Sequence, residues 1–265
     1  MENMYFCNIP MKNMNLNIKD YFITPNKGNN ITDKDYEKLG FLINTVKAFA
    51  RSTYQCVYII DHMKGKFLYA SDNFYDLCGT PSSNIENLAY KFYTDIVPEK
   101  EQDMLIELSR SRFNLFETLP NNERINYTIY SDFHIIQEKK TKLINHKLTP
   151  LVLTLDNQIW LSLCTISISA RKEPGYIIMK KDGKSQYYEY SLENHKWTKK
   201  RSITLSETER DVLRLSRQGY TMSEISETIF KSIDTIKSCK RGLFTKLGVK
   251  NIVEAISFAV NYRLL

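Results

Sequence analysis

The chain has 265 residues, of which 42% are hydrophobic and 25% are charged, a composition typical of one large or two modest soluble domains. No apolar run approaches the ~20 residues that span a bilayer. The N-terminus lacks a basic start followed by an apolar block, so we expect no secretory signal, no membrane partner and a cytoplasmic location.

The net charge of +7 is unevenly distributed along the chain. Residues 199–265 contain thirteen Lys and Arg against seven Asp and Glu, a net charge of +6, whereas residues 1–198 carry only +1. A compact basic region is the electrostatic signature of a nucleic-acid contact. Charge alone leaves open a soluble basic domain that has no such partner.

The first fifty residues predict an irregular segment and an amphipathic helix. Residues 1–31 are rich in Asn and Met and lack periodicity. Residues 32–50 begin with Thr32 and Asp35 at capping-box spacing. An apolar stripe at helical spacing follows, consisting of Leu39, Leu42, Ile43, Val46, Phe49 and Ala50. This stripe either packs on the domain that follows or forms a dimeric coil.

Residues 51–170 predict an α+β domain with one antiparallel sheet. Helical pieces are expected over 72–98 and a longer helix over 99–117, after Pro98. The predicted strands cover 56–60, 66–70, 124–137, 141–155 and 158–169. Asp156-Asn157 supplies a turn between the last two strands.

This order of elements is that of a PAS domain, and the residues also resemble that family. The resemblance is carried by YIIDHMKGKFLYASDNFYDLCGTPSSNI (58–85), with Asn73 and Gly79 at family-like positions, and by YTDIVPEKEQDM (93–104). It covers roughly residues 50–170. It implies a sensing or dimerising module and leaves any small-molecule ligand unidentified.

Residues 171–200 predict an ordered β meander that connects the two halves of the chain. Asp182-Gly183 lies between two strand-like runs and is a strong hairpin signal. Glu193-Asn194 indicates a second turn before the sequence HKW.

Residues 201–265 predict four short helices whose start signals agree with one another. Ser206 with Glu209, and Thr221 with Glu224, form capping boxes. Ser232 suits the start of a third helix over about 233–247, and Asn251 that of a fourth. The short turn Phe230-Lys231-Ser232 joins the second and third helices as a helix-turn-helix.

The third predicted helix has two different faces. Its apolar residues are Ile233, Ile236, Leu243 and Leu247, which we assign to the core, with Cys239 near the boundary. The opposite face carries Lys237, Ser238, Arg241 and Thr245. Lys, Ser and Arg have the donors needed for base edges, and Lys240, Lys246 and Lys250 can reach phosphates. The alternative is a solvated charged face in a helical bundle.

The run from Ile203 to Val260 resembles the LuxR-type DNA-binding domain over its whole length. The matching residues are Glu209, Val212, Leu213, Gly219, Ile225, Ser232, Thr235, Ile236, Lys237, Lys246, Leu247, Val249, Glu254 and Ala255. The resemblance implies that the third helix reads DNA, with Lys237, Ser238 and Arg241 on bases. Thr235 and Lys246 would then hold the phosphate backbone, and we add Ser232 and Lys240 to these phosphate contacts.

The fourth predicted helix resembles the dimerisation helix of that family. Its candidate dimer contacts are Ile252, Ala255, Ile256 and Ala259, with simple bundle packing as the alternative. Three residues depart from the family pattern: Lys231 replaces an aliphatic residue, Cys239 replaces a common His, and Gly242 lies inside the reading helix. These departures put the exact base preference in doubt, and leave the DNA-binding class unaffected.

No catalytic, metal or cofactor motif is recognisable in the sequence. It has no Gly-rich phosphate loop, no nucleophile elbow and no phosphoacceptor Asp cluster. The five cysteines form no CxxC pair, and the four histidines lack metal-ligand spacing.

We therefore expect a one-component transcriptional regulator without enzymatic activity, metal or cofactor. It would act as a homodimer on double-stranded DNA, with RNA polymerase as a further candidate partner. The alternatives are a PAS scaffold that binds a protein partner, and a PAS-linked enzyme.

Overall fold

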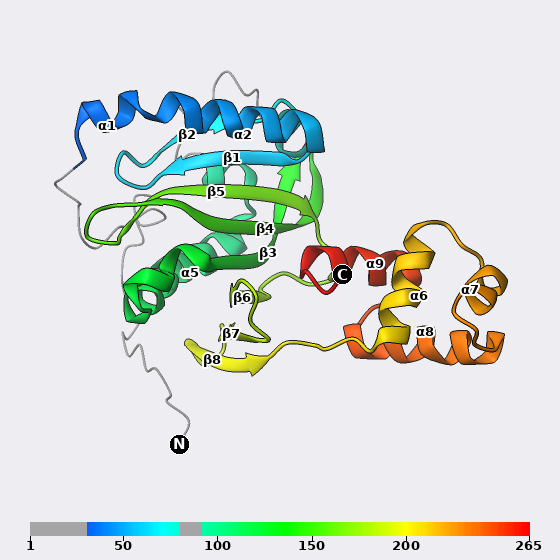
Figure 1. Cartoon of the computed structure of the whole chain (residues 1–265). Coiled ribbons are helices and arrows are strands. Elements are labelled where there is room, and N and C mark those ends of the chain that lie inside the picture. Colours follow the sequence, from blue (N-terminus) through cyan, green and yellow to red (C-terminus); the bar gives the residue numbers. More distant parts are fainter. Residues whose placement is uncertain (1–30, 80–91) are drawn as a thin grey trace. The chain divides into compact units, whose positions relative to one another are not determined.

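The computed structural model describes residues 31–79 and 92–265 (Figure 1). The chain forms two compact units. The N-terminal unit is Met1–Ile168 with Glu173–Lys200, and the C-terminal unit is Ser169–Lys172 with Arg201–Leu265. Residues 1–30 of the irregular segment predicted over 1–31, and the middle of the helical stretch predicted over 72–98, lie outside the described residues. No helix among the described residues is long and apolar enough to cross a membrane.

One eight-stranded sheet organises the N-terminal unit, in the order β2-β1-β5-β4-β3-β6-β7-β8. The strands are β1 Cys56–Asp61, β2 Lys66–Ala70, β3 Tyr127–Gln137, β4 Lys140–Leu153, β5 Ile159–Ile168, β6 Ile177–Lys181, β7 Gln186–Ser191 and β8 Lys196–Arg201. β1 pairs antiparallel with both β2 and β5, and β4 pairs antiparallel with both β3 and β5. The five strands expected between residues 56 and 169 are therefore present, in one antiparallel sheet.

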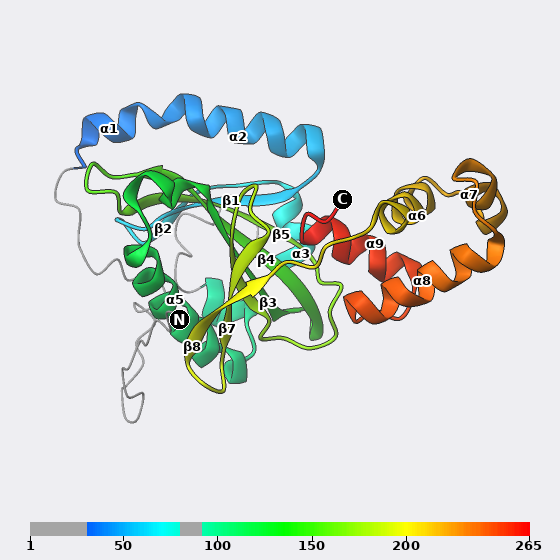
Figure 2. The same cartoon turned by 60° about the horizontal axis from the view of Figure 1, so that its bottom comes forward.

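Both faces of this sheet are covered, because successive side chains of a strand point to opposite sides. On β1, Tyr58 and Ile60 belong to the larger core, which includes apolar residues of α5 (Glu99–Thr118). Val57 and Ile59 belong to a second cluster, with residues of α2 (Leu39–Thr53). Figures 1 and 2 show α2 on one face of the sheet and α5 on the other.

The helix predicted over 32–50 is divided into α1 (Asp33–Glu37) and α2. The expected capping box is present, and the Asp35 carboxylate accepts a hydrogen bond from the Thr32 backbone N–H at 2.9 Å. The apolar stripe packs on the sheet, where Val46 and Ala50 are buried. We expected the stripe either to pack on the domain that follows or to form a dimeric coil. Its buried side packs on the sheet, as in the first alternative, whereas the Phe49 side chain is 46% exposed.

The strand expected over 124–137 begins later than predicted, at Tyr127. Residues Asn121–Asn126 form a 3-10 helix instead, so Ile125 is not a strand residue. The cause is the buried Arg124 side chain, whose guanidinium donates to the carbonyl oxygens of Leu119, Glu117 and Asn157 at 2.8–3.1 Å. Hydrogen bonds from Arg124 to carbonyl oxygens elsewhere in the chain thus stabilise the 3-10 helix, and the local sequence pattern does not reveal them.

The strands after residue 171 extend the same sheet. β6 pairs antiparallel with β3, from Tyr127 opposite Lys181 to Ser131 opposite Ile177. The expected turn at Asp182-Gly183 separates β6 from β7, and Gly183 adopts the left-handed conformation with φ 69°. The Trp197 indole N–H donates to the Ser111 carbonyl oxygen of α5 at 3.2 Å. Residues 177–200 are therefore built into the N-terminal unit, and their role as a connector stays a prediction.

The C-terminal unit consists of short helices around a small apolar core. The helices are α6 Glu207–Arg217, α7 Met222–Thr228, α8 Ile233–Leu247 and α9 Ile252–Asn261. The capping boxes predicted at Ser206 and Thr221 are both present. The fully buried apolar side chains are Val212, Leu213, Ile225, Ile236, Leu243, Ala255 and Ala259.

Candidate nucleic-acid interface

The helix α8 is positioned by its two ends. At its start, Ser232 Oγ accepts a hydrogen bond from the Thr235 backbone N–H at 3.2 Å. At its end, Gly248 adopts the left-handed conformation with φ 68°, which glycine reaches without a Cβ clash. Fifteen residues at 1.5 Å each make α8 about 22 Å long. That length suits the major groove of B-DNA, which admits an α-helix.

The turn before α8 is held by backbone contacts with α7. The Lys231 backbone N–H donates to the Ser226 carbonyl oxygen at 3.0 Å, and the Ser226 hydroxyl donates to the Lys231 carbonyl oxygen. Phe230 takes the left-handed conformation with φ 53°, which reverses the chain, and its side chain is 91% exposed. The expected helix-turn-helix is thus formed by α7, a turn and α8.

The faces of α8 separate largely as predicted. Ile236, Leu243 and Leu247 are buried, and the exposed side carries Lys237, Ser238, Arg241 and Thr245. Ile233, which we assigned to the core, is 42% exposed. The reason is its place as the first residue of the helix, where one neighbouring turn is missing. Cys239 is half-buried, as expected for a boundary residue.

The predicted base-contacting residues are exposed and have few protein partners. Lys237 Nζ lies 3.4 Å from Asp234 Oδ1, an exposed pair one turn apart. Such a pair contributes little and can open readily. The side chains of Ser238 and Arg241 form no hydrogen bond or ion pair with any residue in the described part of the chain. These donors are therefore available to a ligand.

Gly242 lies on the same exposed face, four residues after Ser238 and therefore one turn further along α8. A Cβ atom added at Gly242 would meet no atom within 4 Å. Packing within this chain thus gives no reason for glycine at a position where it costs about 1 kcal/mol relative to alanine. A close approach of another molecule to the helix backbone remains as a reason for it.

The predicted phosphate-contacting residues differ in their surroundings. Ser232 and Thr235 are exposed at the N-terminus of α8, with their hydroxyl oxygens 2.8 Å apart. Lys240 is only half-buried, and burial lowers the pKa of its ammonium group. Lys246 Nζ lies 2.6 Å from both carboxylate oxygens of Glu209. The Lys246 charge is thus partnered inside the unit, which the sequence did not reveal.

This ion pair joins α8 to the start of α6. Burial raises the pKa of Glu209, but hydrogen bonds from Lys246 Nζ and the Ser206 backbone N–H outweigh it, so the pKa lies below its usual value. The same carboxylate therefore completes the capping box of α6 and binds the last turn of α8. Its charge stabilises the orientation of the exposed face of α8.

The candidate dimer contacts on α9 do not all face outward. Ala255 and Ala259 are fully buried, so the structure does not place them on an accessible surface. Alanines one turn apart let α9 pack closely against α6 and α8. Ile252 and Ile256 are half-buried. Val253 is the most exposed apolar residue of this helix, with 73% of its surface accessible. A dimer role for Ile252 and Ile256 stays a prediction.

We expect Glu209→Gln to loosen α6 and α8 without unfolding them. Glutamine keeps the cap but removes the charge that binds Lys246, which costs about 0.2–1 kcal/mol for a surface pair. Because the folded pKa of Glu209 is lowered, this contribution is present above its ordinary value of 4.5 and is lost as the pH falls below it.

Hydrogen exchange of the α6 and α8 amides in the whole chain measures this effect at pH 7 and near pH 3.5. The exposed Glu227→Gln on α7 is the matched control, with no expected effect. Equal protection in the two variants at pH 7 would show that the ion pair contributes nothing.

Comparison with known proteins locates the resemblance in this unit. Residues 203–259 match the family model "Bacterial regulatory proteins, luxR family". The transcriptional activator protein BglJ of Escherichia coli K12 is 41% identical over 58 residues, 22% of this chain and 26% of BglJ. The oxygen regulatory protein NreC of Staphylococcus aureus is 38% identical over 61 residues, 23% of this chain and 28% of NreC. The chain thus matches about a quarter of the length of these curated relatives.

Solved structures resemble a larger part of the chain more weakly. The phage VqmA–DPO complex covers 83% of this chain and 89% of its own, with 17% identity and a TM-score of 0.32. The N-terminal domain of a diguanylate cyclase with PAS/PAC sensor from Marinobacter aquaeolei covers 43% of this chain and 94% of its own, with 10% identity and a TM-score of 0.33. TM-scores in this range do not establish a shared fold.

The evidence for a family is therefore confined to the C-terminal unit, where the capped helices, the turn before α8 and the family match coincide. Residues 203–259 are a LuxR-type helix-turn-helix domain of bacterial transcriptional regulators.

Proposed function

We propose that the chain is a sequence-specific transcriptional regulator that reads double-stranded DNA with α8 and has no enzymatic activity. The observation that carries this proposal is the exposed face of α8, where Ser238 and Arg241 have no partner among the described residues. A buried apolar face anchors the same helix. The anchored helix therefore presents hydrogen-bond donors on one face and has a size that fits the major groove.

Base reading is assigned to Lys237, Ser238 and Arg241. An arginine in the major groove donates two hydrogen bonds to O6 and N7 of a guanine, the commonest specific contact to DNA bases. Lys237 first has to leave Asp234, which costs little because both groups are exposed. Ser238, the residue after Lys237, accepts or donates one hydrogen bond.

Phosphate binding is assigned to Ser232, Thr235, Lys240 and Lys246. The first two lie at the N-terminus of α8, where unpaired backbone N–H groups and the helix dipole favour an anion. Lys246 binds a phosphate either beside Glu209 or by exchanging one for the other. Because phosphate contacts release counterions, binding weakens as salt is added.

The N-terminal unit is proposed to be a PAS-like module that senses a signal or mediates dimerisation. Support comes from the order β2-β1-β5-β4-β3 within its sheet and from helices placed between β2 and β3. The further strands β6, β7 and β8 extend that sheet on one side. Without a phosphoacceptor Asp cluster in the sequence, the regulator would receive its signal directly, as a one-component protein.

A homodimer is proposed because two copies of α8 would double the DNA site. Exposed apolar side chains that a second copy can cover include Val253 on α9 and Phe41 on α2. Half-sites would then lie about one helical turn, or ~34 Å, apart.

The proposed location is cytoplasmic, and RNA polymerase is the proposed further partner. The competing hypothesis is a scaffold whose C-terminal unit binds a protein, and it predicts no affinity for duplex DNA.

We expect Arg241→Ala to relax base preference at one position of each half-site. Loss of a bidentate contact to guanine costs about 1–3 kcal/mol on the preferred sequence and much less on other sequences. Selection of bound duplexes from a random pool by the whole chain measures the preference. The matched control is Arg210→Ala on α6, another exposed arginine, which should leave the preference intact. An unchanged preference in the Arg241 variant contradicts the assignment.

We expect Gly242→Ala to separate the stability of α8 from its DNA affinity. Alanine should stabilise this exposed helix by about 1 kcal/mol, since the added Cβ meets nothing in the chain. If the backbone at this position approaches DNA closely, the same methyl group weakens binding. The two readouts are hydrogen exchange of α8 amides and duplex affinity. Tighter binding in step with the added stability would show that glycine serves no close approach.

A further inference from the structure

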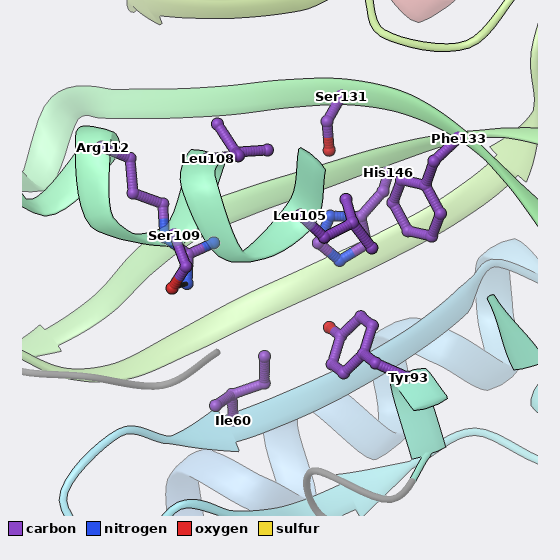
Figure 3. A pocket seen from close by; sticks show the side chains of 9 residues that line it. All are labelled: Ile60, Tyr93, Leu105, Leu108, Ser109, Arg112, Ser131, Phe133 and His146. Carbon is purple, nitrogen blue, oxygen red and sulfur yellow. Dashed lines mark hydrogen bonds between the residues drawn. The ribbon is translucent and has the colours of Figure 1, made fainter. Parts of the chain in front are cut away.

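A cavity of about 30 Å³ lies in the N-terminal unit between α5 and the sheet. Figure 3 shows the side chains that line it. One end is formed by Arg112 and Ser109 of α5, and the other by the aromatic rings of Tyr93, Phe133 and His146. Because a single buried water needs roughly 10–15 Å³ by such a measure, the cavity is large enough for two or three water-sized groups.

Arg112 is the unusual member of this lining. Its side chain is buried, yet the only hydrogen-bond acceptor that it meets among the described residues is Ser109 Oγ, at 3.3 Å. A guanidinium carries five N–H donors. No carboxylate in the described part of the chain forms an ion pair with it, and the centre of the Phe113 ring lies 5.2 Å from Cζ. Burying a cation without an anionic partner is costly.

The neighbouring titratable groups do not supply the missing negative charge. Burial raises the pKa of Tyr58 and of Tyr93 above the usual tyrosine value, and raises that of Cys164 to about 12. These three groups are therefore neutral at pH 7. The Arg112 guanidinium is accordingly the one charge that faces this cavity from the described residues.

The aromatic end of the cavity is neutral and already hydrogen-bonded. Burial, with a smaller effect of Arg112, lowers the pKa of His146 to about 3, so its ring is uncharged. The Tyr58 hydroxyl lies 2.6 Å from His146 Nε2 and 2.7 Å from the Tyr93 hydroxyl. The apolar side chains of Leu105 and Leu108 lie between this end and Arg112 (Figure 3). The cavity thus offers one cation, a rigid polar network and an apolar middle.

We propose that this cavity binds a small organic carboxylate, with its oxygens on the Arg112 guanidinium and its carbon atoms against Leu105 and Leu108. A carboxylate accepts two parallel hydrogen bonds from a guanidinium, which satisfies donors that the described residues leave without acceptors. The apolar middle favours a compound with a short hydrocarbon part over a bare inorganic anion. This inference rests on the sensing role proposed for the N-terminal unit and names the chemical class of its signal.

The test measures ligand binding to the whole chain in the absence of DNA, by thermal shift and calorimetric titration at constant ionic strength. The probes are sodium acetate and propionate, their neutral amides acetamide and propionamide, and sodium phosphate. We expect at least one carboxylate to raise Tm saturably and to bind at least tenfold more tightly than its amide. A ligand that binds only the folded state raises Tm in this manner.

Variants assign the effect to Arg112. Arg112→Met removes the charge and keeps much of the volume, and Arg112→Lys keeps the charge but loses the planar pair of donors. We expect at least tenfold weaker carboxylate binding in both, and unchanged binding in Lys100→Met, which removes an exposed charge from the same helix. Should Arg112→Met fail to fold, the lysine variant and the comparison of carboxylate with amide still decide the question.

Three results would overturn the proposal: no carboxylate binds more tightly than its amide, phosphate binds as tightly as every carboxylate, or the Arg112 variants bind as the unmodified chain does. None of these results bears on DNA reading, because DNA is absent from the experiment. Conversely, carboxylate binding by a chain that fails to bind duplex DNA would leave the cavity assignment intact and would contradict the proposed regulator.

Discussion

The 3.6-residue period of α8 is the constraint on which the proposed DNA contact depends. The buried residues Ile236, Leu243 and Leu247 define one side of the helix, and the period then places Ser238, Arg241 and Gly242 on the other. Caps at both ends stop the helix at about the length of a groove contact. The Glu209–Lys246 ion pair adds a second link between α8 and α6. The orientation of the polar face is therefore a consequence of how the buried face packs, and it needs no contact from the polar side chains themselves.

The N-terminal unit solves a different packing problem, because both faces of its sheet are covered. Alternation along β1 sends Val57 toward α2 and Tyr58 toward α5. The α5 side contains the larger core, and within it a buried cation at Arg112 and a cavity. Natural proteins rarely retain a buried charge without a partner, since an apolar residue of similar size would be less costly. The buried Arg112 guanidinium, which meets only Ser109 Oγ as an acceptor among the described residues, is the reason for proposing a binding site here.

Local signals in the sequence predicted local structure well. The capping boxes at Ser206 and Thr221 lie within four residues of the atoms they bind, so their spacing alone locates the helix starts. Long-range contacts were not visible in this manner. The hydrogen bonds of Arg124, the pairing of β6 with β3 and the Glu209–Lys246 pair join residues between 5 and 54 positions apart. Burial of Ala255 and exposure of Ile233 depend on which helices meet, and a single helical pattern does not encode that.

The most direct test of DNA reading by α8 is the affinity of the whole chain for a mixture of genomic duplex fragments at several salt concentrations, beside the double variant Lys237→Ala/Arg241→Ala. We predict selective retention of a few fragments, an affinity that falls steeply as salt rises, and loss of selectivity in the double variant. An affinity independent of salt, or a double variant that retains the same fragments, would contradict the assignment of α8 as the DNA-reading helix.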